Sequence, residues 1–117
     1  MGNGIAQVAA CAGYDVTMID IKQEYVDKGL AAIENSLSRV VKKERMTAEE
    51  AANALARVKI ATDKSAAADA DLVVEAIPEI PDLKFSTFAE LDQICKPEAI
   101  LASNTSSISI NAIAAAT

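Results

Sequence analysis

The alternation of short apolar runs with longer helix-like segments constrains the fold of this chain more than any other feature. Apolar and β-branched residues dominate residues 15–20, 58–62, 72–77 and 99–102, and each run has the length of a buried strand. Between them, apolar residues recur at three- and four-residue spacing, which is the period of an amphipathic helix. This alternation predicts a doubly wound α/β fold in which helices cover a parallel sheet.

Local signals predict where the helices begin and end. A buried helix is expected over residues 4–11, ended by Gly13, and a long amphipathic helix from Gln23 to about Arg45. Thr47 followed by Glu50 three residues later is a capping box, so a second helix begins there and forms a helical hairpin with the first. Further helices are expected over residues 64–70, from Asp82 to Pro97, and after a cap at Ser109.

The composition favours a small ligand over nucleic acid or a membrane as the partner. The 117 residues carry a net charge of −6 and a pI near 4.5, which disfavours attraction to nucleic-acid phosphates or an anionic bilayer. We find no transmembrane run and no secretory signal pattern, so a cytoplasmic protein is expected. Cys11 and Cys95 lack CxxC spacing and a neighbouring histidine, which favours free buried thiols over a disulfide and predicts no metal site.

Two residues near the start of the chain are typical of dinucleotide binding. Gly2 precedes the first helix and matches the last glycine of a G-x-G-x-x-G loop, whose other glycines would lie before Met1. Asp20 ends the next strand about 18 residues later, close to the roughly 20 expected for the acid that binds the adenosine ribose. A carboxylate there would repel a 2′-phosphate, so NAD is favoured over NADP. The alternative interpretations are that Gly2 is a flexible terminal residue and that Asp20 is a solvated acid at the end of a strand.

Longer motifs extend this pattern along the chain. The sequence GNGIA stands at residues 2–6, DLVVEAIPE at 71–79 and SNTSS at 103–107. Together with Asp20, these motifs resemble the N-terminal NAD-binding domain of the 3-hydroxyacyl-CoA dehydrogenase family in order and spacing. The resemblance implies that residues 1–117 form part of a Rossmann-type doubly wound parallel sheet that lacks its first strand and carries a helical hairpin after the second.

The resemblance also assigns cofactor-binding roles. Glu79 and Lys84 match residues that contact NAD, and Asn104 and Ser106 match the family's SNTSS motif, in which the serine approaches the substrate hydroxyl and the nicotinamide. The alternatives are that Glu79 is a solvated loop acid and that Ser106 is a turn residue bonded to its own backbone. Glu75 lies within an apolar strand, so its carboxylate is expected to face the cleft or to pair with a donor that the sequence does not identify.

Two further residues match the family's contacts to the CoA part of an acyl-CoA substrate. Ser36 and Lys43 both lie on the expected long helix, and a spacing of seven residues is about two helical turns, so both side chains face the same way. The alternative for the lysines at this helix end, Lys42 and Lys43, is that they complement the helix dipole.

The family's catalytic base has no counterpart in this sequence. In the family a histidine, oriented by a glutamate, removes the hydroxyl proton, and it lies in a His-Phe-Phe-Asn-Pro segment after SNTSS. This chain contains no histidine. The resemblance therefore implies a fragment cut at both ends, without the C-terminal helical domain through which the family forms homo-oligomers. We expect the isolated 117 residues to be inactive as a dehydrogenase.

The expected activity of the parent protein is the NAD-dependent interconversion of (S)-3-hydroxyacyl-CoA and 3-oxoacyl-CoA in fatty-acid β-oxidation or butanoate metabolism. Two alternatives stay open. A related sugar-acid dehydrogenase would share the fold and NAD, although Ser36 and Lys43 favour an acyl-CoA substrate. A non-catalytic nucleotide-binding module would be favoured if the reading frame truly began at Met1 and stopped after Thr117.

Overall fold

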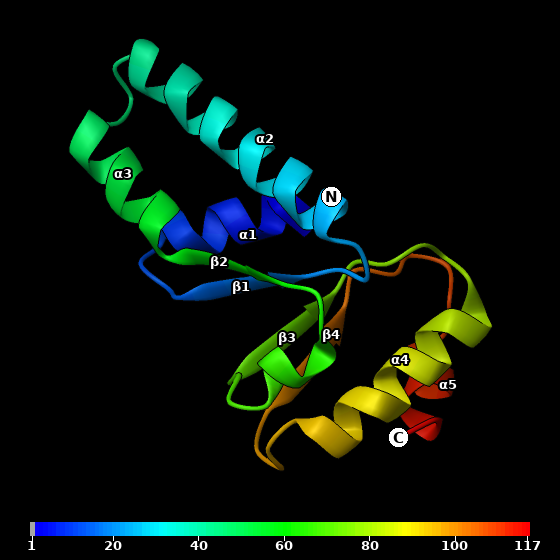
Figure 1. The fold of residues 1–117 in the computed structure, drawn as a ribbon. Helices are drawn as coiled ribbons and strands as arrows, with labels where there is room; N and C mark the ends of the chain where they lie inside the picture. The colour runs from blue at the N-terminus through cyan, green and yellow to red at the C-terminus, as the bar shows by residue number, and fades with distance from the viewer. Residues whose placement is uncertain (1) are drawn as a thin grey trace. The chain divides into compact units, whose positions relative to one another are not determined.

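A computed structural model describes residues 2–117, which divide into two compact units, one ending at Asp63 and the other comprising Lys64–Thr117 (Figure 1). Helices and strands alternate along the chain as the sequence predicts. In order, the elements are α1 (Gly2–Cys11), β1 (Val16–Ile19), α2 (Gln23–Lys42), α3 (Ala48–Ala56), β2 (Val58–Ala61), the 3₁₀ helix η1 (Lys64–Ala67), β3 (Leu72–Glu75), α4 (Pro81–Ile94), β4 (Ile100–Ser103) and α5 (Ile110–Ala115).

The first unit consists of a pair of parallel strands packed against three helices. β1 pairs with β2 in a register that runs from Val16 opposite Val58 to Ile19 opposite Ala61. Figure 1 shows α2 and α3 side by side as the predicted hairpin, and both helices contact α1. The buried core of this unit consists of apolar residues from all three helices and β2: Ala6, Ala10, Ile33, Leu37, Ala54 and Val58.

Backbone geometry explains where two helices of the first unit end. Gly13 follows α1 with a φ of 99°, a conformation that glycine adopts without the steric cost of a Cβ, as predicted for a helix stop. α2 ends at Lys42 rather than at about Arg45, because Glu44 has a φ of 56° and cannot continue a right-handed helix. The Thr47–Glu50 capping box is present, so the predicted start of α3 is confirmed.

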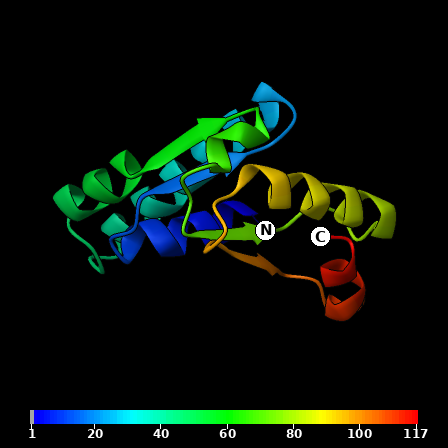
Figure 2. The same ribbon diagram turned by 90° about the horizontal axis from the view of Figure 1, so that it is seen from below.

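The second unit is built on the parallel pair β3 and β4, which Figure 2 shows side by side. Pro81 begins α4 at a position where its missing N–H costs no helical hydrogen bond. α4 contacts both η1 and α5, and the side-chain oxygen of Ser109 accepts from the Ala112 N–H as the predicted cap of α5. The buried apolar residues of this unit are Ala67, Phe88, Leu91 and Ile113.

Several predictions of burial are wrong. Leu72 on β3 and Ile100 on β4 are 55% and 64% exposed, although both strands were expected to be buried. α1 buries only one face, so Val8 is 71% exposed and Cys11 is also exposed rather than buried. Apolar composition therefore identifies these elements correctly, but it does not determine which of their faces the rest of the chain covers.

Candidate functional site

The carboxyl ends of β3 and β4 bring two predicted polar segments to one edge of the second unit. Because the strands are parallel and Glu75 is opposite Ser103, the residues that follow both strands leave the sheet on the same side. The N–H of Asn104 donates to the carbonyl oxygen of Glu75 at 3.0 Å, which extends the pairing by one residue. In open α/β sheets, ligands bind at the carboxyl edge.

A buried ion pair lies at this edge. The Lys84 ammonium on α4 is 2.6 Å from Glu75 Oε2, and the side chains are 0% and 1% exposed. Glu75 Oε2 also accepts the N–H of Ile77 at 2.7 Å, and Oε1 accepts the hydroxyl of Ser103 at 2.6 Å. The sequence did not identify a donor that pairs with Glu75. Lys84, Ile77 and Ser103 are these donors, and they satisfy a carboxylate that would be costly to bury alone.

Lys84 carries its charge in spite of its burial. Burial lowers the pKa of the ammonium, but hydrogen bonds and charge attraction from Glu75 and Glu79 outweigh this effect and raise the pKa above its usual value. Glu79 lies 3.1 Å from the same ammonium. Lys84 is therefore a fixed positive charge between two carboxylates.

Glu79 joins this ion pair to the turn that follows β4. Its Oε2 accepts the hydroxyls of Thr105 at 2.7 Å and Ser107 at 2.6 Å. These two hydrogen bonds, Ser107 first, and the weaker contribution of Lys84 hold the pKa of Glu79 at about 2. Glu79 is thus ionised at neutral pH. We call the connected residues Glu75, Glu79, Lys84, Ser103, Thr105 and Ser107 the Lys84 cluster.

The structure brings together Glu79 and Lys84, two of the four cofactor-binding residues that the sequence predicts in this unit. Asn104 and Ser106 lie in the same turn and are exposed, alternating with Thr105 and Ser107. Their contacts to a ligand stay predictions. The role of Glu75 as the partner of Lys84 was missed, although a lysine in the first turn of the helix that follows a strand with a buried acid is a usable signal.

The predicted cofactor residues of the first unit have simpler surroundings. Asp20 follows β1 and is exposed, and its Oδ1 accepts the N–H of Ile21 at 2.7 Å. The N–H of Asp20 donates to the carbonyl oxygen of Ala61 at 3.2 Å, which continues the strand pairing. Gly2 is the first residue of α1, whose first turn carries no acidic side chain. An exposed carboxylate and a helix start of this kind suit a ribose hydroxyl and a phosphate respectively.

The two predicted CoA contacts differ in their surroundings. Ser36 lies on α2 and is half-buried, and its hydroxyl oxygen accepts from the Gln7 side-chain amide of α1 at 3.0 Å. Lys43 is exposed and follows the last residue of α2, where its backbone N–H caps the helix by donating to the carbonyl oxygen of Arg39. That Ser36 and Lys43 both contact the CoA part of the substrate stays a prediction.

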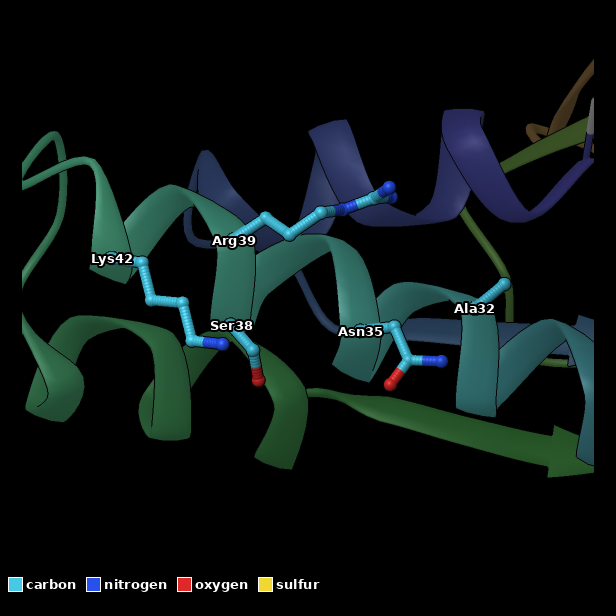
Figure 3. A pocket seen from close by; sticks show the side chains of 5 residues that line it. All are labelled: Ala32, Asn35, Ser38, Arg39 and Lys42. Atoms are coloured by element: carbon cyan, nitrogen blue, oxygen red, sulfur yellow. The ribbon is translucent and has the colours of Figure 1, made fainter.

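An open pocket of about 480 Å³ lies on α2 (Figure 3). Ala32, Asn35, Ser38, Arg39 and Lys42 line it, so it includes neither Ser36 nor Lys43. Figure 3 shows that Asn35, Ser38 and Lys42 point to one side of the helix, whereas Arg39 extends away from them. The lining offers two cations and no acid, which suits an anionic group.

Residues 2–117 contain neither a cluster of metal ligands nor a membrane-spanning helix. No group of three His, Cys, Asp or Glu side chains in this range could hold a metal ion. No helix in the same range is long and apolar enough to cross a membrane. Cys11 and Cys95 are both free thiols.

Comparison with known proteins identifies the family. Residues 1–117 match the family model described as 3-hydroxyacyl-CoA dehydrogenase, NAD binding domain. The chain belongs to this family. It is 51% identical over 116 residues to a probable 3-hydroxybutyryl-CoA dehydrogenase of Deinococcus radiodurans, covering 99% of this chain and 41% of that protein. It is 44% identical over 115 residues to 3-hydroxyadipyl-CoA dehydrogenase of Escherichia coli, covering 98% of this chain and 24% of that protein.

A solved structure agrees with this assignment. The crystal structure of (S)-3-hydroxybutyryl-CoA dehydrogenase from Ralstonia eutropha matches with a TM-score of 0.97 and 46% identity, covering 100% of this chain and 41% of that chain. The predicted Rossmann-type fold and NAD as the cofactor of this family are therefore confirmed. The chain spans about two fifths of the length of the Deinococcus and Ralstonia proteins.

The residues at the strand ends fit an NAD cofactor. NAD needs an acceptor for its ribose hydroxyls, and Asp20 supplies an exposed carboxylate at the end of β1. Its pyrophosphate needs a helix start without competing acids, and the first turn of α1 provides one. Within the second unit, Glu79 is ionised and Asn104 is exposed, and both suit hydrogen bonds to a cofactor.

Proposed function

We propose that the complete protein is an NAD-dependent oxidoreductase that interconverts (S)-3-hydroxyacyl-CoA and 3-oxoacyl-CoA, as in fatty-acid or butanoate metabolism. The observation that carries this proposal is the family match along residues 1–117. Short-chain substrates of the 3-hydroxybutyryl-CoA type are favoured, because the Deinococcus and Ralstonia relatives carry that name.

Residues of the first unit bind the adenosine side of NAD in this proposal. Gly2 lets the start of α1 approach the pyrophosphate, and Asp20 accepts hydrogen bonds from the ribose hydroxyls. The exposure of Asp20 and its place directly after β1 support this role. Its negative charge selects NAD over NADP because a 2′-phosphate would be repelled.

Residues of the second unit bind the reacting side. When bound, NAD accepts the hydride from the substrate carbon. Glu79 and Asn104 contact the cofactor, Ser106 contacts both the cofactor and the substrate hydroxyl, and Lys84 completes the site from its buried position next to Glu79. The exposure of Asn104 and Ser106 within the turn that Glu79 holds supports these assignments.

The acyl-CoA partner is assigned to α2. Lys43, directly after α2, attracts a phosphate of the CoA part, and Ser36 on α2 contributes its half-buried hydroxyl. The pocket on α2, with its cations Arg39 and Lys42, supports an anionic ligand on this helix.

We further propose that the complete protein is a cytoplasmic homo-oligomer. The two free thiols suit a reducing compartment, and the family resemblance implies oligomerisation through a helical domain outside these residues.

The proton of the substrate hydroxyl needs a base from outside this chain, because the 117 residues contain no histidine. The isolated chain is therefore expected to show no oxidation of 3-hydroxybutyryl-CoA. The complete protein, assayed by NADH absorbance with (S)-3-hydroxybutyryl-CoA and NAD, is expected to be active. Oxidation of a sugar acid, with no activity on 3-hydroxybutyryl- or 3-hydroxyadipyl-CoA, would overturn the proposed substrate class.

The cofactor assignment has its own test. Asp20→Asn in the complete protein is expected to weaken NAD binding about tenfold, since a hydrogen bond to a charged group contributes about 1.5–3 kcal/mol. Binding is measured by titration calorimetry. The matched control is Asp15→Asn, which neutralises an exposed acid just before β1 and leaves the affinity for NAD unchanged. Equal affinities in all three proteins would contradict the role of Asp20.

A further inference from the structure

Gln7 is a polar side chain at the edge of an apolar helix interface. It is the only strongly polar residue between Gly4 and Cys11 of α1. Ala6 and Ala10 of the same helix are buried in the core of the first unit, and Gln7 itself is half-buried. An amide that is partly removed from water needs a hydrogen-bond partner within the protein, because burying it unpaired is costly.

The partner of Gln7 is the hydroxyl of Ser36 on α2. Gln7 Nε2 donates to Ser36 Oγ at 3.0 Å, and the two residues are 29 positions apart in the sequence. Ser36 lies next to Leu37 and three residues after Ile33, and both of these apolar residues belong to the buried core that α1 and α2 share. The hydrogen bond therefore lies at the border of a packed interface, which fixes the distance between the two helices.

The direction of this hydrogen bond determines what Ser36 offers to a ligand. A serine hydroxyl has one O–H donor and two lone pairs, whereas a side-chain amide nitrogen donates and does not accept. Because Gln7 Nε2 donates to Ser36 Oγ, the hydroxyl proton points away from that nitrogen. Within residues 2–117, no acceptor is hydrogen-bonded to this proton. The O–H of Ser36 is thus directed for donation to a ligand.

A hydroxyl that donates suits the phosphates of CoA. A phosphate oxygen accepts hydrogen bonds and carries negative charge, so it attracts an O–H donor and repels the lone pairs of a hydroxyl turned the other way. Lys43, which is exposed, supplies a positive charge seven residues after Ser36. The cation attracts the phosphate, and the directed hydroxyl adds a hydrogen bond of defined geometry.

We propose that Gln7 is a positioning residue for acyl-CoA: its side-chain amide occupies a lone pair of Ser36 and directs the hydroxyl proton toward a phosphate of the CoA part. This role rests on the proposed function, which assigns Ser36 to that part of the substrate. It gives α1 a second task besides the phosphate-binding start at Gly2, because the same helix then orients a residue that binds acyl-CoA.

The first test is the steady-state kinetics of the complete protein with NAD and (S)-3-hydroxybutyryl-CoA. Gln7→Met, which has nearly the same length but no amide, is expected to raise KM for the acyl-CoA about fivefold, because the hydroxyl loses part of a hydrogen bond to a charged group. The KM for NAD and kcat are expected to stay unchanged. The matched control is Gln93→Met, which alters an exposed glutamine of α4 and leaves all three constants unchanged. A purely structural role of Gln7 would not raise one KM selectively.

A second variant tests the direction of the bond and also serves if Gln7→Met does not fold. The carboxylate of Gln7→Glu accepts and cannot donate, so it draws the Ser36 proton away from the phosphate. The KM for acyl-CoA is expected to rise about tenfold, more than in Gln7→Met. Gln93→Glu adds the same negative charge elsewhere and is the control. A KM for acyl-CoA in Gln7→Glu equal to that of the unmodified protein would overturn the inference.

A double-mutant cycle tests whether Gln7 acts through Ser36. Ser36→Ala is expected to raise KM for acyl-CoA about tenfold, and adding Gln7→Met to it is expected to cause no further rise. If the two effects multiply to about fiftyfold, Gln7 acts independently of Ser36 and the inference fails. Inactivity of the unmodified protein on both 3-hydroxybutyryl- and 3-hydroxyadipyl-CoA would instead refute the proposed function, and the role of Gln7 would fall with it.

Discussion

The two units of this chain share a plan but place their polar groups differently. Each has a pair of parallel strands with helices packed on it. The first unit buries a cluster of six apolar residues. Its candidate ligand-binding residues Asp20 and Lys43 are exposed and are not part of that cluster. The second unit buries an ion pair, Glu75 with Lys84, whose hydrogen bonds continue into its candidate site.

The two units therefore differ in whether the residues that stabilise the unit are also its candidate binding residues. In the first unit the buried core is apolar and the candidate NAD-binding carboxylate Asp20 is exposed, so stability and NAD binding can change independently. In the second unit the same carboxylates contribute to stability and to the site. Glu75 and Glu79 each contact Lys84, Glu75 also accepts from Ser103 at the end of β4, and Glu79 accepts from Thr105 in the turn after it. Substitutions there are expected to change stability and binding together.

The largest effect is expected for the buried charge of the second unit. Lys84→Met leaves the Glu75 carboxylate buried without its cation, so the free energy of unfolding is expected to fall by about 3–5 kcal/mol. Chemical denaturation of the complete protein measures this change. Lys96→Met, which breaks an ion pair with an acid that is 93% exposed, is expected to change stability little. Equal losses in both variants would remove the distinction between buried and surface pairs.

The apolar core of the first unit is expected to give the next largest effect. Ile33 is 1% exposed, and Ile33→Ala is expected to cost about 2–5 kcal/mol from lost burial and the cavity left behind. Ile21→Ala is the control, because Ile21 is 76% exposed and its truncation is expected to have little effect on the denaturation midpoint. NAD affinity is expected to survive Ile33→Ala in the folded fraction, and a large loss of affinity there would show that core and ligand residues of this unit are coupled.

Much of the fold could be predicted from the sequence because its signals are local. The capping box of Thr47 and Glu50, the stop at Gly13 and the cap at Ser109 each involve residues within a few positions of one another, and all three are present. Burial was predicted less well, as Leu72 and Ile100 show, because exposure depends on which distant segments cover a strand. A run of apolar letters carries no information about that cover.

The candidate site shows the same division. The sequence predicts that polar residues follow β3 and β4, and the family resemblance selects a set of cofactor-binding residues: Glu79, Lys84, Asn104 and Ser106. The sequence does not show that Thr105 and Ser107 both donate to Glu79. These residues lie 26 and 28 positions after Glu79, and their bonds depend on how β3 and β4 pair. The partner of Glu75 was missed for a different reason: Lys84 is only nine residues away, but the loop between β3 and α4 that brings the two together follows no regular repeat.

A smaller effect is expected at the helix caps, which both units contain. Thr47→Ala removes the acceptor for the Glu50 N–H and breaks the capping box of α3, with an expected loss of about 1 kcal/mol. Ser109→Ala removes one cap bond, at 3.3 Å, from the shorter α5 and is expected to cost less. Thermal denaturation of the two variants gives the ranking, and a larger loss for Ser109→Ala would contradict it.

The smallest effect is expected from the titration of Glu79, and its sign follows from the structure. The pKa of this carboxyl is about 2 in the folded protein and near 4.5 without its partners. A lowered pKa means that the ionised form favours the folded state, so this stabilisation is present above about pH 4.5 and is lost as the pH falls toward about 2. The free energy of unfolding, measured by denaturant titration at several pH values in this window, is expected to fall less steeply in Glu79→Gln than in the unmodified protein.

Glu90→Gln, which neutralises an acid paired with Lys64 on the surface, is the control and should retain the steeper fall. Parallel curves for Glu79→Gln and the unmodified protein would mean that the hydroxyls of Thr105 and Ser107 do not hold the Glu79 charge, and the second unit would then differ from the first only in its buried pair.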